Sequence, residues 1–147
     1  MKKLVFLLIT LAAMVLLAIP VVADDTSDLN YMESVRAEYM DRINSEGQTM
    51  IFDEIRLVEE GSPYSFPLTV GTGDYEIWGV GGPGMRDLNI RIYSADRTLL
   101  AEDTETDNYP VLSFSEPVSR SHRVIIEGSE FEAGIDQGYY LIIVVRN

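Results

Sequence analysis

The 147-residue sequence contains no cysteine, and this absence excludes several kinds of site at once. Disulfide bonds, thiolate zinc sites and cysteine nucleophiles cannot form, and no cysteine is available for lipid modification at a leader cleavage site. An exported chain without disulfide bonds depends on its hydrophobic core for stability.

Lysine and histidine are almost as scarce. The only lysines are Lys2 and Lys3, and the formal net charge at pH 7 is −13. A surface this acidic repels phosphate backbones and anionic lipid head groups, so we do not expect nucleic-acid binding. The single histidine, His122, cannot supply a histidine-rich zinc site. Because its neighbours in a strand point to the opposite face, we expect it at the surface or rim of a sheet and not in a serine-hydrolase triad.

The first 23 residues have the pattern of a secretory signal peptide. A basic start precedes an apolar run over residues 4–19, and Pro20 and small residues up to Ala23 follow. The run is short for a membrane span, which needs about 20 apolar residues. The prediction for residues 1–23 is therefore cleavage after Ala23, export to the periplasm or out of the cell, and no membrane span in the mature chain.

Residues 24–47 are predicted to form a polar leader and an amphipathic helix. From residue 28 to residue 46 apolar side chains recur at steps of three and four, and Gly47 is a typical helix stop. The stripe consists of Leu29, Met32, Val35, Tyr39, Met40 and Ile43. Two interpretations stay open: the stripe covers the rest of the domain, or it holds a partner chain.

Residues 48–147 predict an all-β fold, an antiparallel sandwich of about eight strands. Short segments rich in β-branched and aromatic residues alternate with turn residues. The expected strands are 50–58, 64–70, 75–80, 88–93, 98–101, 111–114, 123–127 and 139–146. Pro67 indicates an edge strand or a bulge. Residues 141–145 are all apolar and predict a central strand covered on both faces, with the helix as the natural cover of one face.

The stretch Asp-Leu-Asn-Ile-Arg-Ile-Tyr at residues 87–93 resembles the Asp-Leu-Asp-Leu-x-Leu-Tyr strand of bacterial pre-peptidase C-terminal domains. Residues 75–79 and the ending Gly-Tyr-Tyr-Leu at 138–141 are similar too. The resemblance implies a jelly-roll-like β-sandwich in a diverged, stand-alone exported protein that is not itself catalytic. In that family the domain usually accompanies a secreted peptidase, and some related domains bind calcium or extracellular polymers. Asn89 stands where the family motif has its second aspartate.

Acidic side chains gather in the predicted loop between residues 101 and 110. Asp103 and Asp107 lie in this loop, and Asp87 begins the strand of the family motif. An EF-hand is excluded because the glycine and the final glutamate that its loop requires are missing. Two interpretations stay open: a calcium site of different geometry made by Asp87, Asp103 and Asp107, or a turn in which aspartates cap backbone N–H groups. Arg86 or Arg91 could neutralise the carboxylates without a metal.

Two further patterns give coarser predictions. The glycine-rich run 79–84 lacks the lysine of a phosphate loop and predicts a hairpin connection. Six aromatic side chains either line a sugar-stacking surface or belong to the core and to cross-strand pairs: Tyr75, Trp78, Tyr93, Tyr109, Tyr139 and Tyr140.

The sequence therefore predicts an exported, non-enzymatic binding or accessory module. Calcium is the one cofactor that the acidic loop favours, and the partner is an unidentified protein or extracellular polymer. The alternative is a structural or interaction protein of the cell envelope that holds a partner through the N-terminal helix or a sheet edge. A glycan hydrolase is the third interpretation, but no specific pair of carboxylates favours it.

Overall fold

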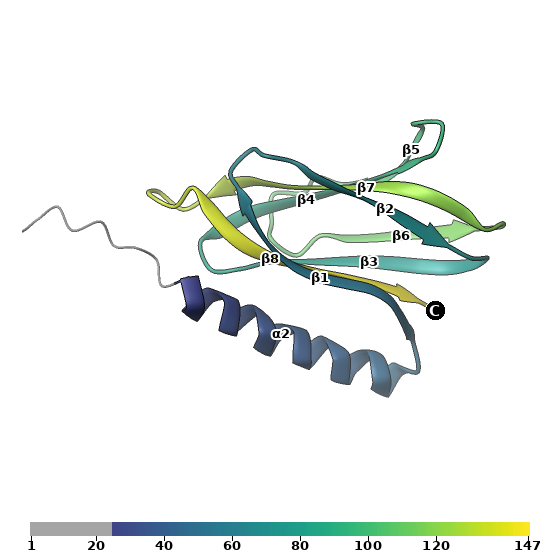
Figure 1. The fold of residues 1–147 in the computed structure, drawn as a ribbon, viewed down its shortest axis with the longest axis horizontal. Helices are drawn as coiled ribbons and strands as arrows, with labels where there is room; N and C mark the ends of the chain where they lie inside the picture. Colours follow the sequence, from purple (N-terminus) through teal and green to yellow (C-terminus); the bar gives the residue numbers. More distant parts are fainter. Residues whose placement is uncertain (1–24) are drawn as a thin grey trace, which may run out of the picture.

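The computed structural model describes residues 25–147, which form a helix and two sheets in three layers (Figure 1). The predicted signal peptide lies outside the described residues. Helix α2 spans Asp25–Glu46, and within residues 25–147 no helix combines the length and apolar character that a membrane crossing requires. The strands are β1 (Thr49–Glu59), β2 (Tyr64–Val70), β3 (Gly73–Gly81), β4 (Met85–Ser94), β5 (Leu99–Asp103), β6 (Val111–Glu116), β7 (Arg120–Phe131) and β8 (Gln137–Arg146).

The strands form two antiparallel sheets that pack face to face. Sheet A has the order β1-β8-β3-β6, and sheet B has the order β2-β7-β4-β5. This arrangement confirms the predicted β-sandwich with one N-terminal helix, and all eight predicted strands are present. Pro67 lies on β2, an edge strand of sheet B, where its missing N–H leaves no gap inside the sheet.

Alternating side chains fill the space between the two sheets. On β4, Leu88, Ile90 and Ile92 point into this core and are fully buried, whereas Arg91 and Tyr93 point outward and are half-buried. The same core takes its other members from both sheets, among them Phe66, Leu68, Ile77, Leu112, Val124, Ile126, Tyr140, Ile142 and Val144. The period of two in the sequence therefore marks the two faces of sheet B as predicted.

Helix α2 packs on the outer face of sheet A and creates a second core. Met32 and Ile43 of the predicted stripe are 0% and 1% exposed. Their cluster includes Trp78 and Val80 of β3 and Leu141, Ile143 and Val145 of β8. Strand β8 is therefore buried on both faces, which is why residues 141–145 are apolar at every position. The helix is the cover that the sequence predicted, and its stripe is occupied by the protein's own sheet.

The helix is held at its edge and at its end as well. Arg36 forms an ion pair with Asp53 of β1 and lies 3.5 Å from Glu33. The hydrogen bond that Arg36 donates to the carboxylate of Asp53 raises the pKa of Arg36 above its usual value. Gly47 ends the helix with a φ of 72°, a conformation that favours glycine.

We predict that Ile43→Ala lowers the free energy of unfolding by about 2–4 kcal/mol, because it opens a cavity between the helix and sheet A. The matched control is Leu29→Ala, on the same stripe but 36% exposed, which should cost about 0.5 kcal/mol or less. Urea denaturation followed by circular dichroism measures both values. If both variants lose a similar, small amount of unfolding free energy, the helix is not part of the core.

Candidate functional site

The acidic loop joins sheet B to sheet A at one edge of the sandwich. Its backbone, residues 104–110, is tied to neighbouring strands: Leu88 donates its N–H to the carbonyl of Asp107 at 2.9 Å, and Gly79 to that of Pro110 at 2.8 Å. The approach depends on glycine, because a Cβ at Gly79 would lie 2.7 Å from Cγ of Pro110. The run 79–84 is therefore a hairpin connection only in part. Strand β3 extends to residue 81, and its glycines allow close packing.

Two of the predicted site residues, Asp103 at the end of β5 and Asp107 in the loop, use their carboxylates to accept backbone N–H groups. Asp103 accepts hydrogen bonds from the N–H groups of Glu105 at 3.1 Å and Val111 at 2.9 Å. Asp107 accepts one from the N–H of Tyr109 at 2.8 Å. These contacts form the capped turn that the sequence left open as the alternative to a metal site.

Asp87 makes a separate set of contacts between β4 and β7. Its carboxylate accepts hydrogen bonds from the hydroxyl of Ser129 and from the amide of Asn89. Asn89 also donates to Ser129 at 2.8 Å, so the residue that departs from the family motif belongs to this polar group. Among residues 25–147, no three or more acidic or histidine side chains are placed together so that they could hold a metal ion. Calcium binding by Asp87, Asp103 and Asp107 stays a prediction.

The arginines that could have neutralised these aspartates pair with glutamates on the neighbouring strands. Arg86 lies 3.7 Å from Glu130 of β7. Arg91 lies 3.2 Å from Glu127 of β7 and 3.6 Å from Glu102 of β5. The partners are set by cross-strand register, so nearness in sequence to Asp87 did not predict them.

We predict that Asp103→Ala lowers the free energy of unfolding by about 1–2 kcal/mol, because two backbone N–H groups lose their acceptor. A loss of the same size in millimolar calcium and in chelator would favour the capped turn over the calcium site. The control is Glu105→Ala, in the same exposed loop and with the same change of charge, which should stay within about 0.5 kcal/mol. Thermal melts in the two buffers provide the measurement; a loss that occurs only with calcium would identify Asp103 as a metal ligand.

The prediction for His122 is wrong, because its side chain is buried. Strand β7 begins at Arg120, earlier than predicted, and the alternation places His122 on the same face as Val124, toward the core. The side chain is 0% exposed, and its Nε2 lies 2.9 Å from Oε2 of Glu116, which is 5% exposed. The ring meets Phe114 edge-on at 5.7 Å. The imidazole of His122 thus lies against a buried carboxylate at one end of the core.

We predict that Glu116→Ala lowers the free energy of unfolding by about 1–3 kcal/mol, because it leaves the buried imidazole of His122 without its polar neighbour. Replacing both partners by apolar residues, Glu116→Leu with His122→Phe, should recover most of this loss. Chemical denaturation of the three proteins tests the pair. If the double variant is no more stable than Glu116→Ala, the two side chains do not act as a pair.

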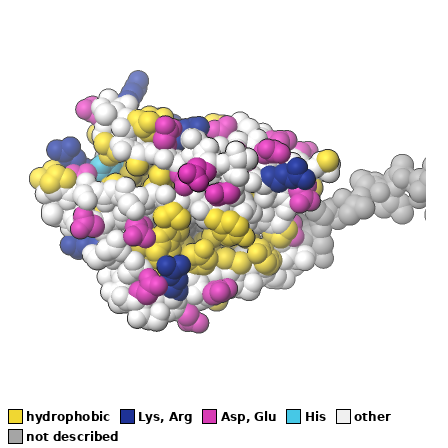
Figure 2. All heavy atoms as spheres, turned by 180° about the vertical axis from the view of Figure 1, so that it is seen from behind, with side chains coloured by type: hydrophobic (Ala, Val, Ile, Leu, Met, Phe, Trp, Pro, Cys, Tyr) yellow, Lys and Arg dark blue, Asp and Glu magenta, His cyan; other side chains and the backbone are white. Residues whose placement is uncertain are grey.

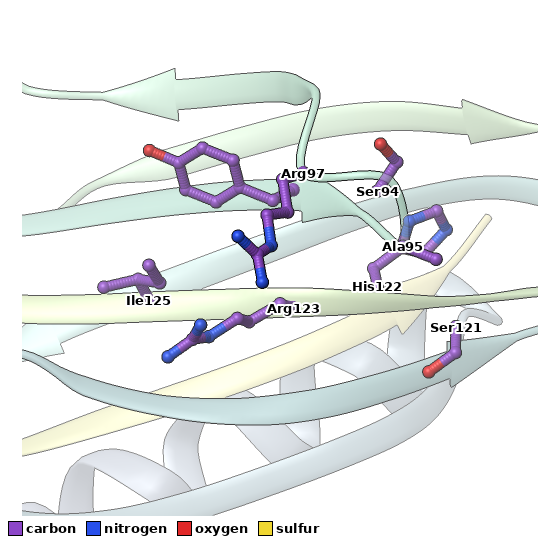
Figure 3. A pocket seen from close by; sticks show the side chains of 8 residues that line it. Ser94, Ala95, Arg97, Ser121, His122, Arg123 and Ile125 are labelled. Carbon is purple, nitrogen blue, oxygen red and sulfur yellow. The ribbon is translucent and has the colours of Figure 1, made fainter.

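The outer face of sheet B carries a cleft of about 410 Å³, shown in Figure 3. It opens where β4, β7 and the turn between β4 and β5 meet. The cleft is lined by Tyr93, Ser94, Ala95, Arg97, Ser121, His122, Arg123 and Ile125. None of these residues is acidic, although the chain has 24 aspartates and glutamates. The cleft therefore places two arginines, Arg97 and Arg123, in a lining without carboxylates.

Register brings these cleft residues together across the sheet. Tyr93 of β4 and Arg123 of β7 are direct partners in the antiparallel ladder, and both point outward. Arg123 also donates a hydrogen bond to Oγ of Ser65 on β2, at 2.9 Å. A second hollow of about 250 Å³, lined by Ser65 and Pro67, lies beside Arg123 as well. Arg123 is thus shared by two depressions of one sheet face.

The turn between β4 and β5 presents Arg97 in a conformation that L-residues avoid. Arg97 has a φ of 68°, whereas the other described residues with positive φ are glycines. Asp96 braces the turn by accepting hydrogen bonds from the hydroxyl of Ser94 and the N–H of Thr98, and these bonds lower the pKa of Asp96. A left-handed conformation costs a non-glycine residue about 1–2 kcal/mol. The turn therefore keeps an arginine where glycine would be more stable.

Three of the six aromatic side chains lie in the core, which the sequence left open as the alternative to a sugar-stacking surface. Tyr75, Trp78 and Tyr140 are buried, and burial raises the pKa of Tyr140 above its usual value. Only Tyr93 lies in the cleft, and Tyr109 is exposed on the acidic loop. Neither Arg97 nor Arg123 belongs to a sequence motif, and their one signal in the sequence is a basic side chain in a strongly acidic chain.

No protein-family model matches the sequence, and no curated protein does either. Similar solved structures include the periplasmic g-type lysozyme inhibitor PliG of Aeromonas hydrophila, with 9% identity and a TM-score of 0.48 over 69% of this chain and 90% of that one. The pre-peptidase C-terminal domain of Bacillus anthracis collagenase has 9% identity and a TM-score of 0.47, over 63% and 89% of the two chains.

A carbohydrate-binding module of Cellvibrio mixtus lichenase 5A, in complex with cellotriose, is also similar. It has 10% identity and a TM-score of 0.36, over 67% of this chain and 89% of that one. These likenesses lie in the general β-sandwich architecture. Membership of the pre-peptidase C-terminal family stays a prediction from the motif at residues 87–93.

Proposed function

We propose that the chain is an exported, non-enzymatic binding module that binds its ligand on the outer face of sheet B. The observation that carries this proposal is the asymmetry of the sandwich. Helix α2 covers the outer face of sheet A, whereas the outer face of sheet B holds the cleft beside Tyr93 and Ile125 (Figures 1 and 3). Concave sites with apolar walls and a few polar groups are typical of ligand binding.

The composition of the cleft favours binding over catalysis. General acid–base chemistry most often uses histidine or a carboxylate in reach of the ligand. The lining contains no carboxylate, and the side chain of His122 is buried against Glu116. Export rests on the signal-peptide pattern of residues 1–23, and a calcium-stabilised form through Asp87, Asp103 and Asp107 stays a prediction.

We predict that ligands from a panel of soluble oligosaccharides and short peptides shift the backbone NMR signals of Tyr93, Ser121 and Ile125 in ¹⁵N-labelled protein. Tyr93→Ala should weaken such binding about tenfold or more, because an aromatic wall of the cleft is lost. The control is Tyr109→Ala, which removes an exposed tyrosine outside the cleft and should leave binding unchanged. Shifts that gather on another face would contradict the proposal.

A second candidate is an interaction protein that uses a sheet edge. Strands β5 and β6 are edge strands of the two sheets and lie next to each other. Large apolar side chains are 41–54% exposed there and in the preceding loop, namely Leu99, Leu100, Tyr109 and Val111. Figure 2 shows hydrophobic side chains gathered on one face of the molecule with acidic ones around them. An extended segment of a partner protein could pair with such an edge, and shifts confined to Tyr109 and Val111 would favour this function.

A further inference from the structure

The arginines of the described chain differ in whether they have an acidic partner. Most lie within ion-pair distance of a carboxylate: Arg36, Arg42, Arg56, Arg86, Arg91 and Arg120. Among residues 25–147, Arg97, Arg123 and Arg146 have no such partner. In a chain with 24 acidic residues, an arginine without a carboxylate is the unusual case.

Two of these three arginines line the same cleft. Arg146 lies elsewhere and donates a hydrogen bond to the carbonyl of Thr72 at 2.8 Å. Arg123 has a single neutral partner, Oγ of Ser65. In Figure 3 the side chain of Arg97 extends from the turn over the sheet toward β7, which carries Arg123 and Ile125. Two guanidinium groups on the lining of one cleft offer an anion charge-assisted donors from two directions.

The backbone at Arg97 is a second, independent observation. Its φ of 68° is unfavourable for arginine, and glycine would fit the turn without strain. The turn is nevertheless closed by hydrogen bonds from Thr98 and Ser94 to Asp96. Strain of this kind persists where the side chain has a use, so we take it as a sign that the guanidinium matters more than the turn.

We propose that the cleft binds the oxyanion group of a ligand, a carboxylate or a phosphate, through Arg97 and Arg123. The N–H donors of a guanidinium group form a planar fork that matches two oxygens of a carboxylate or a phosphate. The resulting hydrogen bonds are charge-assisted. Tyr93 and Ile125 provide the surface on which the rest of the ligand packs. This inference rests on the proposed function, since it specifies the ligand of the same face.

Because the net charge is −13, anion binding depends on the residues that line the cleft. A chain with this charge repels anions at long range, so an anion gains only from groups that it touches. An acid-free lining is therefore required for such a site, and the cleft supplies it.

The test is a titration of ¹⁵N-labelled protein with three probes: inorganic phosphate, D-glucuronate and neutral D-glucose. We expect phosphate or glucuronate to move the side-chain Nε–H signals of Arg97 and Arg123, and glucose to leave them in place. A stronger effect of phosphate identifies a phosphorylated ligand, and a stronger effect of glucuronate identifies an acidic sugar. If neither anion moves the two signals, the inference is wrong.

Matched variants separate the site from general charge effects. Arg123→Gln should weaken anion binding about tenfold or more, as expected for the loss of a charge-assisted hydrogen bond. Arg86→Gln makes the same change of charge at an exposed position outside the cleft and should leave binding unchanged. An equal effect of Arg86→Gln would overturn the proposal.

Arg97→Gly provides the sharpest variant, because it removes the side chain and the unfavourable backbone conformation together. We expect its melting temperature to be unchanged or raised, while anion binding is lost. Retained anion binding would overturn the role of Arg97. If the anions do not bind but neutral ligands still shift the NMR signals of Tyr93 and Ile125, only this inference is wrong. If no ligand shifts the signals of that face, the proposed function is wrong as well.

Discussion

The burial of strand β8 on both faces is the constraint on which the rest of the structure depends. Ile142 and Val144 face the core between the sheets, and Leu141, Ile143 and Val145 face the helix. A strand of this kind cannot leave either face to water, so sheet A needs a cover, and α2 supplies it. A chain without cysteine has no disulfide bond to replace that packing. As a consequence, the helix closes one outer face of the sandwich, and the other outer face carries the cleft.

Local patterns predicted most of the fold. The eight strands, the covering helix, the central position of β8 and the edge position of Pro67 all follow from periodicity and residue type within short segments. The capped turn at Asp103 and Asp107 could be proposed from the sequence for the same reason. An aspartate that accepts the N–H of the residue two positions later makes a local contact. Such features need no knowledge of which strands are neighbours.

Contacts between distant segments could not be predicted in this way. His122 was misplaced because β7 extends beyond its apolar segment, so the alternation that turns the ring inward begins outside the obvious pattern. Its partner Glu116 lies on another strand of the other sheet. The pairing of Arg91 with Glu127 and of Tyr93 with Arg123 likewise depends on the register of β4 against β7. Register is set by the whole sandwich, and no single segment contains it.

The turn at Arg97 depends both on local contacts and on contacts between distant segments. Its closure is local, because Ser94, Asp96 and Thr98 form hydrogen bonds with one another within residues 94–98. Its position above Arg123 is non-local, because it follows from the pairing of β4 with β7. A tight turn restricts where the backbone of Arg97 can be, so less conformational entropy is lost when the side chain contacts a ligand. The proposed anion site would therefore be formed before a ligand binds, because the hydrogen-bonded turn holds Arg97 and the strand register holds Arg123 and Tyr93.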